Sequence, residues 1–258
     1  QTGKVTRYQD KIEDISLSSS LVWNIYKDSQ NVLWIGLFPD ILAKEGQRNT
    51  DFTIIDTKLD KNTATKFVYS GKVFHEDRQS NLWIGTANNL YSISKDRQVI
   101  TDYKKQYLDK WIIGEDIQAI FEDSQGKIWI GTERGFLVVN TETKQNTFYT
   151  GYVSGIYISD SYICSFWEDE NKNIWIATKG SGVLRFNPET NEFTAITEKD
   201  GLPHNNTYGI LGDSKNTLWI SSDNGLVHYD PDKKTFELFG VNDGLQGKEF
   251  NRYAFFKS

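Results

Sequence analysis

The chain has 258 residues, a length that is enough for one large domain or two small ones. Its formal net charge at pH 7 is -6. The negative charge argues against a nucleic-acid partner, because an excess of Lys and Arg is what holds a phosphate backbone. No apolar run approaches the roughly 18 residues of a membrane span. The single cysteine, Cys164, excludes an intramolecular disulfide and a multi-cysteine metal site.

The chain opens at Gln1 and contains no methionine. We therefore interpret it as a piece of a longer protein, in which any membrane contact comes from segments outside this sequence.

A ten-residue motif recurs five times along the chain. Each copy starts at an acid and reaches a tryptophan six residues later, as in "DSQGKIWIGT" (123–132). The tryptophans follow one another every 44 to 49 residues: Trp34, Trp83, Trp129, Trp175 and Trp219. A regular period of this length is typical of a repeat architecture.

Each repeat is predicted to form four short strands. In the third repeat these are residues 117–123, 127–132, 135–140 and 146–150, separated by polar turn residues. The second strand is apolar at consecutive positions, which indicates that both faces of its sheet are covered. The predicted repeats span residues 20–70, 71–104, 115–150, 161–197 and 206–240.

The first repeat departs from this pattern. We expect a long insert in it at "FPDILAKEGQRNTDFT" (38–53), followed by a junction near residue 70 with almost no linker.

Four strands in a period of 40 to 50 residues predict an all-β fold, a β-propeller of four-stranded antiparallel blades. We expect one propeller domain over residues 1–258. Residues 1–9 and 249–258 are predicted to share a partial blade, since joining the two ends of the chain protects exposed sheet edges. Six or seven blades, or part of a larger array, are compatible with this pattern.

The motif residues themselves are expected to be structural. An Asp that begins a tight turn accepts hydrogen bonds from the backbone two residues on, and Gly or Asn near the end of the turn tolerates a left-handed conformation. The residue two positions after each tryptophan is small, as required where another chain segment comes close.

The repeats resemble the two-component regulator propeller family, best in residues 117–140 and 198–239. The resemblance implies the periplasmic sensor region of a hybrid two-component regulator of Bacteroidetes type, which detects glycan-derived oligosaccharides. It also implies a homodimeric receptor whose transmembrane and kinase parts lie outside this chain, and it implies no cofactor.

A ligand is expected on the face that carries the blade-to-blade loops, because those loops vary most. There the aromatic rings can stack on a sugar, and the amide and cationic groups can bind hydroxyls or carboxylates. Trp111 leads this set because it falls outside the repeat pattern, although it could equally cap the edge of a blade. The candidate ligand-binding residues are Trp111, Arg134, Tyr157, Tyr162, Lys179, His204, Asn205 and Asn224.

No catalytic residue and no metal site is predicted. The chain has no H-E-x-x-H, no G-x-S-x-G and no phosphate-binding glycine loop. His75 falls in a first strand and is expected to be packed, which leaves His204 as the one histidine in a loop of the variable face. Two alternatives stay open: a propeller lyase that uses His204, an acid and a divalent metal, and a propeller that serves only protein contacts.

Overall fold

The computed structural model describes residues 21–38, 41–46, 52–54, 72–87, 89–103, 116–153, 155–158 and 161–251. Within these residues the chain forms five four-stranded antiparallel sheets, each with its strands in sequence order, and one two-stranded hairpin. The chain divides into two compact units, residues 1–114 and 115–258. The predicted all-β class with four-stranded antiparallel blades is confirmed.

Unit 1 contains two of the sheets. Blade 1 consists of β1 (Leu21–Lys27), β2 (Leu33–Phe38), β3 (Ile41–Glu45) and β4 (Phe52–Ile54). Blade 2 consists of β5 (Val73–Glu76), β6 (Leu82–Gly85), β7 (Leu90–Ile93) and β8 (Ile100–Asp102).

The predicted insert at residues 38–53 was wrong, because it contains the third strand and most of the fourth strand of blade 1. Ile35 pairs with Ala43 across β2 and β3, and Glu45 pairs with Phe52 across β3 and β4. The side chains of Leu42 and Ala43 are buried, and this burial supports a strand that the polar residues around it obscured in the sequence.

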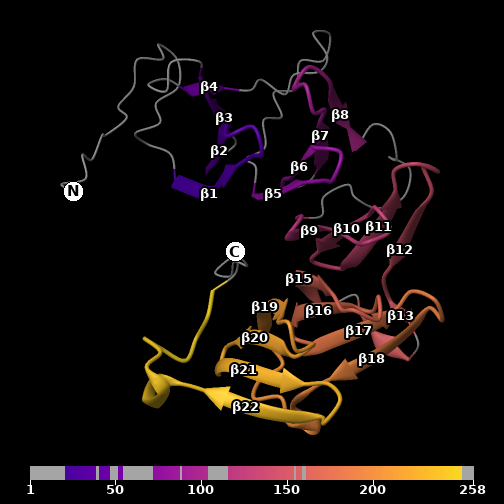
Figure 1. Ribbon diagram of the computed structural model, residues 1–258, viewed down its shortest axis with the longest axis vertical. Helices are drawn as coiled ribbons and strands as arrows, with labels where there is room; N and C mark the ends of the chain where they lie inside the picture. Colours follow the sequence, from indigo (N-terminus) through magenta and orange to yellow (C-terminus); the bar gives the residue numbers. More distant parts are fainter. Residues whose placement is uncertain are drawn as a thin grey trace. The chain divides into compact units, whose positions relative to one another are not determined.

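Unit 2 contains three sheets that lie side by side (Figure 1). Blade 3 is β9 (Ala119–Glu122), β10 (Lys127–Thr132), β11 (Gly135–Asn140) and β12 (Asn146–Tyr149). Blade 4 is β15 (Tyr162–Glu168), β16 (Ile174–Lys179), β17 (Val183–Asn187) and β18 (Glu192–Ile196). Blade 5 is β19 (Thr207–Gly212), β20 (Leu218–Ser222), β21 (Gly225–Asp230) and β22 (Thr235–Phe239).

The connections of unit 2 contain further elements. A small hairpin of β13 (Tyr152–Val153) and β14 (Ile156–Tyr157) lies between blades 3 and 4. Two 3-10 helices, η2 (Glu198–Asp200) and η3 (Val241–Asp243), follow blades 4 and 5. We predicted that residues 1–9 and 249–258 share a blade. Residues 1–9 and 252–258 lie outside the described residues, and residues 249–251 are in no strand.

The core lies between neighbouring sheets. Trp129 of blade 3 packs against Phe166 and Phe186 of blade 4, and Trp175 of blade 4 packs in the same way against Tyr229 of blade 5. β6 and the four residues Ile174–Ala177 of β16 are buried at every position, as expected for strands that are covered on both faces.

The Asp that starts each motif organises its turn. In blade 3 the Asp123 Oδ1 accepts backbone N–H groups of Gln125 and Lys127, both at 2.9 Å, while Oδ2 accepts the Trp129 indole N–H at 2.8 Å. The same indole bond, at 2.8 to 2.9 Å, recurs in blades 1, 2 and 4. The third residue after the Asp has a positive φ in all five motifs: Asn31, Ser80, Gly126, Lys172 and Asn216. The motif is therefore a structural unit of turn and anchored ring.

A second contact joins neighbouring sheets. In unit 2 the Ser124 N–H and hydroxyl donate to the Glu168 carboxylate at 2.6 and 2.5 Å. In unit 1 Ser29 makes the same pair of bonds to Glu76, both at 2.7 Å. Glu76 and Glu168 each stand directly before the motif Asp of their own blade, and each binds the turn of the preceding blade. The neighbouring acids Glu76–Asp77 and Glu168–Asp169 therefore have a structural role.

Candidate functional site

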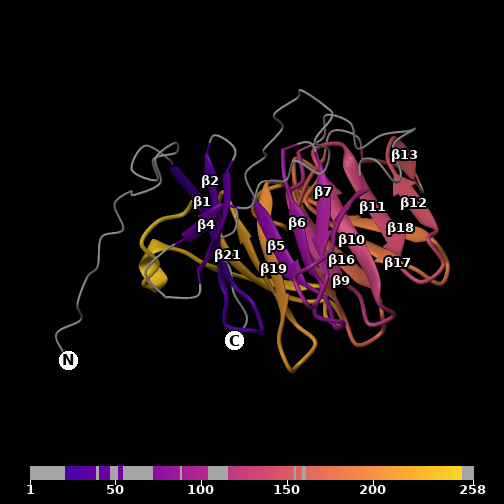
Figure 2. The ribbon, with the colours of Figure 1, turned by 90° about the horizontal axis from the view of Figure 1, so that it is seen from above.

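The antiparallel order of unit 2 brings two kinds of loop to one edge of its sheets. These are the turns between second and third strands and the loops between blades, and the Asp turns lie at the opposite edge (Figure 2). The two kinds of loop touch, since Lys179 forms an isolated bridge with Asn206 and the Gly182 N–H donates to the Asn205 carbonyl at 2.8 Å.

The polar side chains of this edge gather around Asp223, which follows β20. Its Oδ1 accepts the Tyr208 hydroxyl at 2.6 Å, and its Oδ2 accepts the Asn206 amide at 2.7 Å. The His204 Nδ1 lies 3.9 Å from the same Oδ2. We call Asp223, Tyr208, Asn206, His204 and Lys179 the Asp223 cluster.

Asp223 carries its charge at neutral pH. Burial raises the pKa of its carboxyl, but the hydrogen bonds from Tyr208 and Asn206 and the positive charges of Lys179 and of His204 in its protonated form outweigh burial, so the pKa lies below its usual value. The side chain remains 29% exposed. An anionic, oriented and accessible carboxylate is a good acceptor for ligand hydroxyl groups.

The tautomer of neutral His204 follows from its backbone contact. The Asn206 N–H donates to the His204 Nδ1 at 2.9 Å, so Nδ1 must present a lone pair and the ring proton is assigned to Nε2. The side chain is 40% exposed. Neutral His204 therefore offers a hydrogen-bond donor at Nε2, not a proton-accepting nitrogen.

Tyr162 and Lys179 stand opposite each other at the first pair of β15 and β16. The Lys179 Nζ lies 5.9 Å from the centre of the Tyr162 ring. Lys179 also contributes to the lowered pKa of the Asp223 carboxyl. Three residues predicted from the sequence, Tyr162, Lys179 and His204, are thus brought together by blades 4 and 5.

Asn205 forms hydrogen bonds within the loop that contains it. Its Oδ1 accepts the Glu198 N–H at 3.0 Å, and its own N–H donates to the Glu198 carboxylate at 2.9 Å. Its carbonyl also holds the turn after β16. These contacts make Asn205 a support for the neighbouring His204.

Tyr157 and Arg134 lie apart from the Asp223 cluster. Tyr157 is 43% exposed on the β13–β14 hairpin, and its ring lies 4.9 Å from that of Tyr152, which is 77% exposed. The hairpin is anchored by Ile158, which is fully buried. Arg134 is exposed in the turn between β10 and β11, where its carbonyl accepts the Thr150 hydroxyl.

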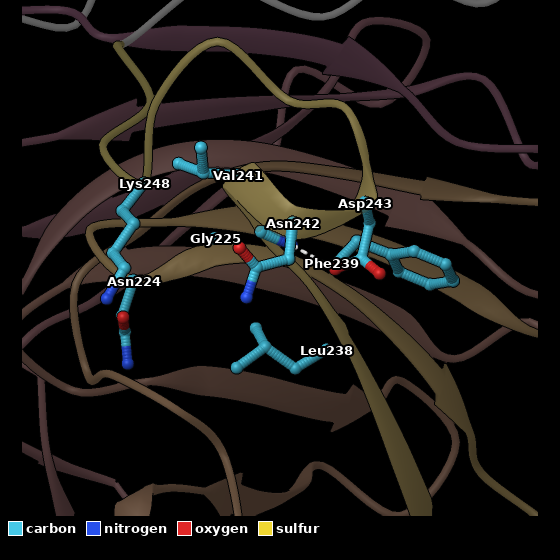
Figure 3. Close-up of a pocket in the computed structure, with 9 residues that line it drawn as sticks. Asn224, Gly225, Leu238, Phe239, Val241, Asn242, Asp243 and Lys248 are labelled. Atoms are coloured by element: carbon cyan, nitrogen blue, oxygen red, sulfur yellow. Dashed lines mark hydrogen bonds between the residues drawn. The ribbon is translucent and has the colours of Figure 1, made fainter.

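Asn224 lines a pocket of about 390 Å³ beside β22, together with Leu238, Val241 and Lys248 (Figure 3). Trp111, our leading residue from the sequence, lies outside the described residues.

The sequence analysis missed Asp223, Asn206 and Tyr208. A signal was present, because "SDNG" contains a charged residue at the same turn position as Lys179. We chose the neighbouring Asn224 instead. That Asp223 is the centre of the cluster depends on the approach of two loops, which no local pattern encodes.

Other features of the described residues point to structure. No group of three or more His, Cys, Asp or Glu side chains gathers there as a metal site would. Cys164 is buried, and its thiol donates to the Tyr162 carbonyl at 3.6 Å. The His75 Nε2 is covered, with no hydrogen-bond partner in the described part of the chain, and burial lowers the pKa of His75 to about 4. No helix in the described ranges has the length and hydropathy to cross a membrane.

Three segments of the chain match the family model described as "Two component regulator propeller", at residues 16–38, 112–134 and 201–224. A similar curated protein is histidine kinase P4 of Formosa agariphila, which is 27% identical over 261 residues. The match covers 97% of this chain but only 15% of the length of that relative.

Two solved structures share the fold. The extracellular domain of a putative hybrid two component system of B. thetaiotaomicron has a TM-score of 0.59 at 17% identity, over 90% of this chain and 35% of that chain. Virginiamycin B lyase of Staphylococcus aureus has a TM-score of 0.61 at 14% identity, over 84% of this chain and 69% of that chain. The predicted β-propeller fold is confirmed.

Proposed function

We propose that this chain, which belongs to the two-component regulator propeller family, is the extracytoplasmic ligand-sensing part of a longer receptor. The proposal is supported by its likeness to the extracellular domain of a putative hybrid two component system and by its match to a histidine kinase of which it spans a small part. The transmembrane and kinase functions would belong to other parts of that receptor, and its location would be periplasmic.

The observation that carries the ligand proposal is the Asp223 cluster. It offers a charged acceptor at Asp223, an N–H donor at His204 Nε2, an ammonium group at Lys179 and the neighbouring ring of Tyr162. Ligand sites commonly combine a few oriented polar groups with an apolar surface. This set suits a hydroxyl-rich ligand, and we propose a glycan-derived oligosaccharide.

The geometry favours binding over lyase chemistry. A lyase that used His204 as its general base would need a free ring nitrogen, but the Nδ1 accepts the Asn206 N–H and the Nε2 carries the proton in the neutral ring. His204 is then suited to hold a ligand oxygen. We therefore propose a non-catalytic site.

Signalling would require that the ligand bind two arrangements of the receptor with different affinity, because only a difference in affinity shifts an equilibrium. A homodimeric receptor would supply such arrangements.

The test is calorimetry of the 258-residue chain against a panel of neutral and acidic oligosaccharides. We expect one class to bind, and we expect Lys179→Gln and Tyr162→Ala each to weaken it about ten-fold, the loss of one charged hydrogen bond or of one stacked ring. Lys172→Gln is the matched control, since Lys172 lies at the far end of the same hairpin and should leave binding unchanged. The absence of heat with every sugar would overturn the glycan proposal.

A further inference from the structure

The loops that follow blades 4 and 5 have the same backbone geometry. In both, a 3-10 helix ends at a glycine with a left-handed φ, Gly201 and Gly244. The Thr197 N–H donates to the Asp200 carboxylate at 2.9 Å, and the Gly240 N–H donates to Asp243 at 2.8 Å. We call residues 197–205 the first loop and residues 240–248 the second loop.

The two loops also meet their blades alike. The Gly182 N–H donates to the Asn205 carbonyl at 2.8 Å, and the Gly225 N–H donates to the Lys248 carbonyl at 2.6 Å. Lys248 therefore stands in the second loop where Asn205 stands in the first. By the same count, Val241 stands where Glu198 stands.

This exchange of two residues changes the hydrogen bonds within the loop. In the first loop, Glu198 and Asn205 hold each other by two reciprocal hydrogen bonds of 2.9 and 3.0 Å. Val241 has no polar side-chain atom to form such a pair with Lys248. The second loop borders the pocket of about 390 Å³ beside β22.

The lining of the pocket is chemically divided, and Figure 3 shows the arrangement. Lys248 and Asn224 lie on one side, and Asp243 lies on the other. Between them are the side chains of Leu238, which is 48% exposed, and Val241, which is 53% exposed. A cation and an acid thus stand at opposite sides of an aliphatic surface, and the Asn242 amide points into the space between them.

Blade 5 leaves part of the first loop exposed. Blade 5 packs against blade 4, with Phe236 beneath Gly201, yet Glu198, Lys199 and Asp200 of the first loop remain exposed. The matching residues of the second loop, Val241, Asn242 and Asp243, are exposed as well.

We propose that this pocket binds a short aliphatic peptide with both termini free, a function beyond the sensing of an oligosaccharide at the Asp223 cluster. The peptide carboxylate pairs with Lys248, the amino terminus faces Asp243, and the aliphatic side chain rests on Leu238 and Val241. The amides of Asn224 and Asn242 bind the peptide group, which needs one donor and one acceptor. A volume of about 390 Å³ is within the range of small-ligand sites.

The dipeptide Gly-Leu is the probe, titrated into the 258-residue chain by calorimetry. We expect binding that weakens about ten-fold when the carboxylate is replaced by an amide, since a charged hydrogen bond is lost. Acetylation of the amino terminus and replacement of Leu by Ser should each weaken it several-fold. Glucuronate offers a carboxylate without an alkyl group, so tighter binding of glucuronate than of Gly-Leu would overturn the peptide proposal.

Variants test the site directly. Lys248→Gln should weaken Gly-Leu about ten-fold, while Lys199→Gln, at an exposed position of the first loop, should leave binding unchanged. The double variant Val241→Glu, Lys248→Asn recreates the closed pair of the first loop. It should abolish binding with an unchanged or higher Tm, which separates loss of the pocket from loss of the fold. Binding that persists in this double variant, or no binding of Gly-Leu by the original chain, would overturn the proposal.

Discussion

Blades 4 and 5 have the same four strands and the same Asp turn, but they use the motif tryptophan differently. In blade 4 the Asp169 carboxylate accepts the Trp175 indole N–H at 2.9 Å and the Asn173 side-chain amide. In blade 5 the Asp213 Oδ2 accepts the Thr217 hydroxyl at 2.8 Å, and the half-buried Trp219 ring stacks on His228 at 4.5 Å.

The difference comes from two positions that the repeat does not fix. Thr217 replaces Asn173 four residues after the Asp, and its hydroxyl connects Asp213 to the His228 Nε2 at 2.7 Å. His228 stands opposite Trp219 in β21, where blade 4 has Arg185. The backbone hydrogen bonds of the turn are kept in both blades, so the repeat determines the backbone while single side chains determine the packing and the charge around it.

The largest expected effect on stability comes from replacing the motif Asp in each of the two blades. Asp169→Ala should cost about 3 kcal/mol or more in the free energy of unfolding, because it leaves buried donors of Asn173 and Trp175 without an acceptor. Asp213→Ala should cost about 1 kcal/mol, since the Asp213 side chain is 31% exposed and water can take the place of its carboxylate. Urea unfolding of both variants is the measurement, and equal losses would contradict the distinction between the blades.

A smaller effect tests the contact between the two blades. A Cβ at Gly212 would stand 2.3 Å from the Trp167 Nε1, so Gly212→Ala should destabilise the chain by about 1–2 kcal/mol through overpacking. Gly240→Ala is the control, because no atom lies within 4 Å of a Cβ there and its φ of -137° is accessible to any residue. Thermal unfolding at one pH compares them, and a Gly212 variant as stable as the control would refute the close contact.

The smallest effect extends the comparison to blade 2, where His75 takes the strand position of Trp167 and Leu211. Burial lowers the pKa of His75 to about 4, so the folded state keeps it neutral while the unfolded state, with a pKa near 6.5, gains a proton. The stabilisation is present above about pH 6.5 and is lost as the pH falls towards 4.

We expect His75→Phe, which copies Phe121 of blade 3, to remove about 1–2 kcal/mol of the stability that the chain loses between pH 7 and pH 4. Urea unfolding across that range gives the difference between the two proteins. Parallel curves would show that His75 is protonated equally in the folded and unfolded states.

The fold was largely predictable because the repeat appears in the sequence five times. The period of the repeat predicted four strands for each blade. The apolar run of "KIWIGT" predicted burial on both faces of the sheet, and β10 is buried from Ile128 to Thr132. The exception was residues 38–53, where the polar "KEGQRNTD" hid two strands. Their pairing depends on β2 and on burial of Leu42 and Ala43, which the local pattern did not show.

The site was less predictable. Tyr162, Lys179 and His204 could be chosen as aromatic, basic and titratable residues of variable loops. Asp223 could not be ranked above Asn224, because its role arises from hydrogen bonds to Tyr208 and Asn206, 15 and 17 residues away. Asn205 was chosen for its residue type, yet its amide is used within its own loop.

The sequence by itself determined the repeat, the strands and the anchored tryptophans, because each motif Asp bonds partners within six residues of it. The tertiary structure decided which polar residues of the loops meet. It brought Asp223 to His204, and it left Lys248 beside Val241 where the preceding loop has a closed pair. Those outcomes depend on contacts between separate loops and strands, and a periodic pattern specifies only what is close along the chain.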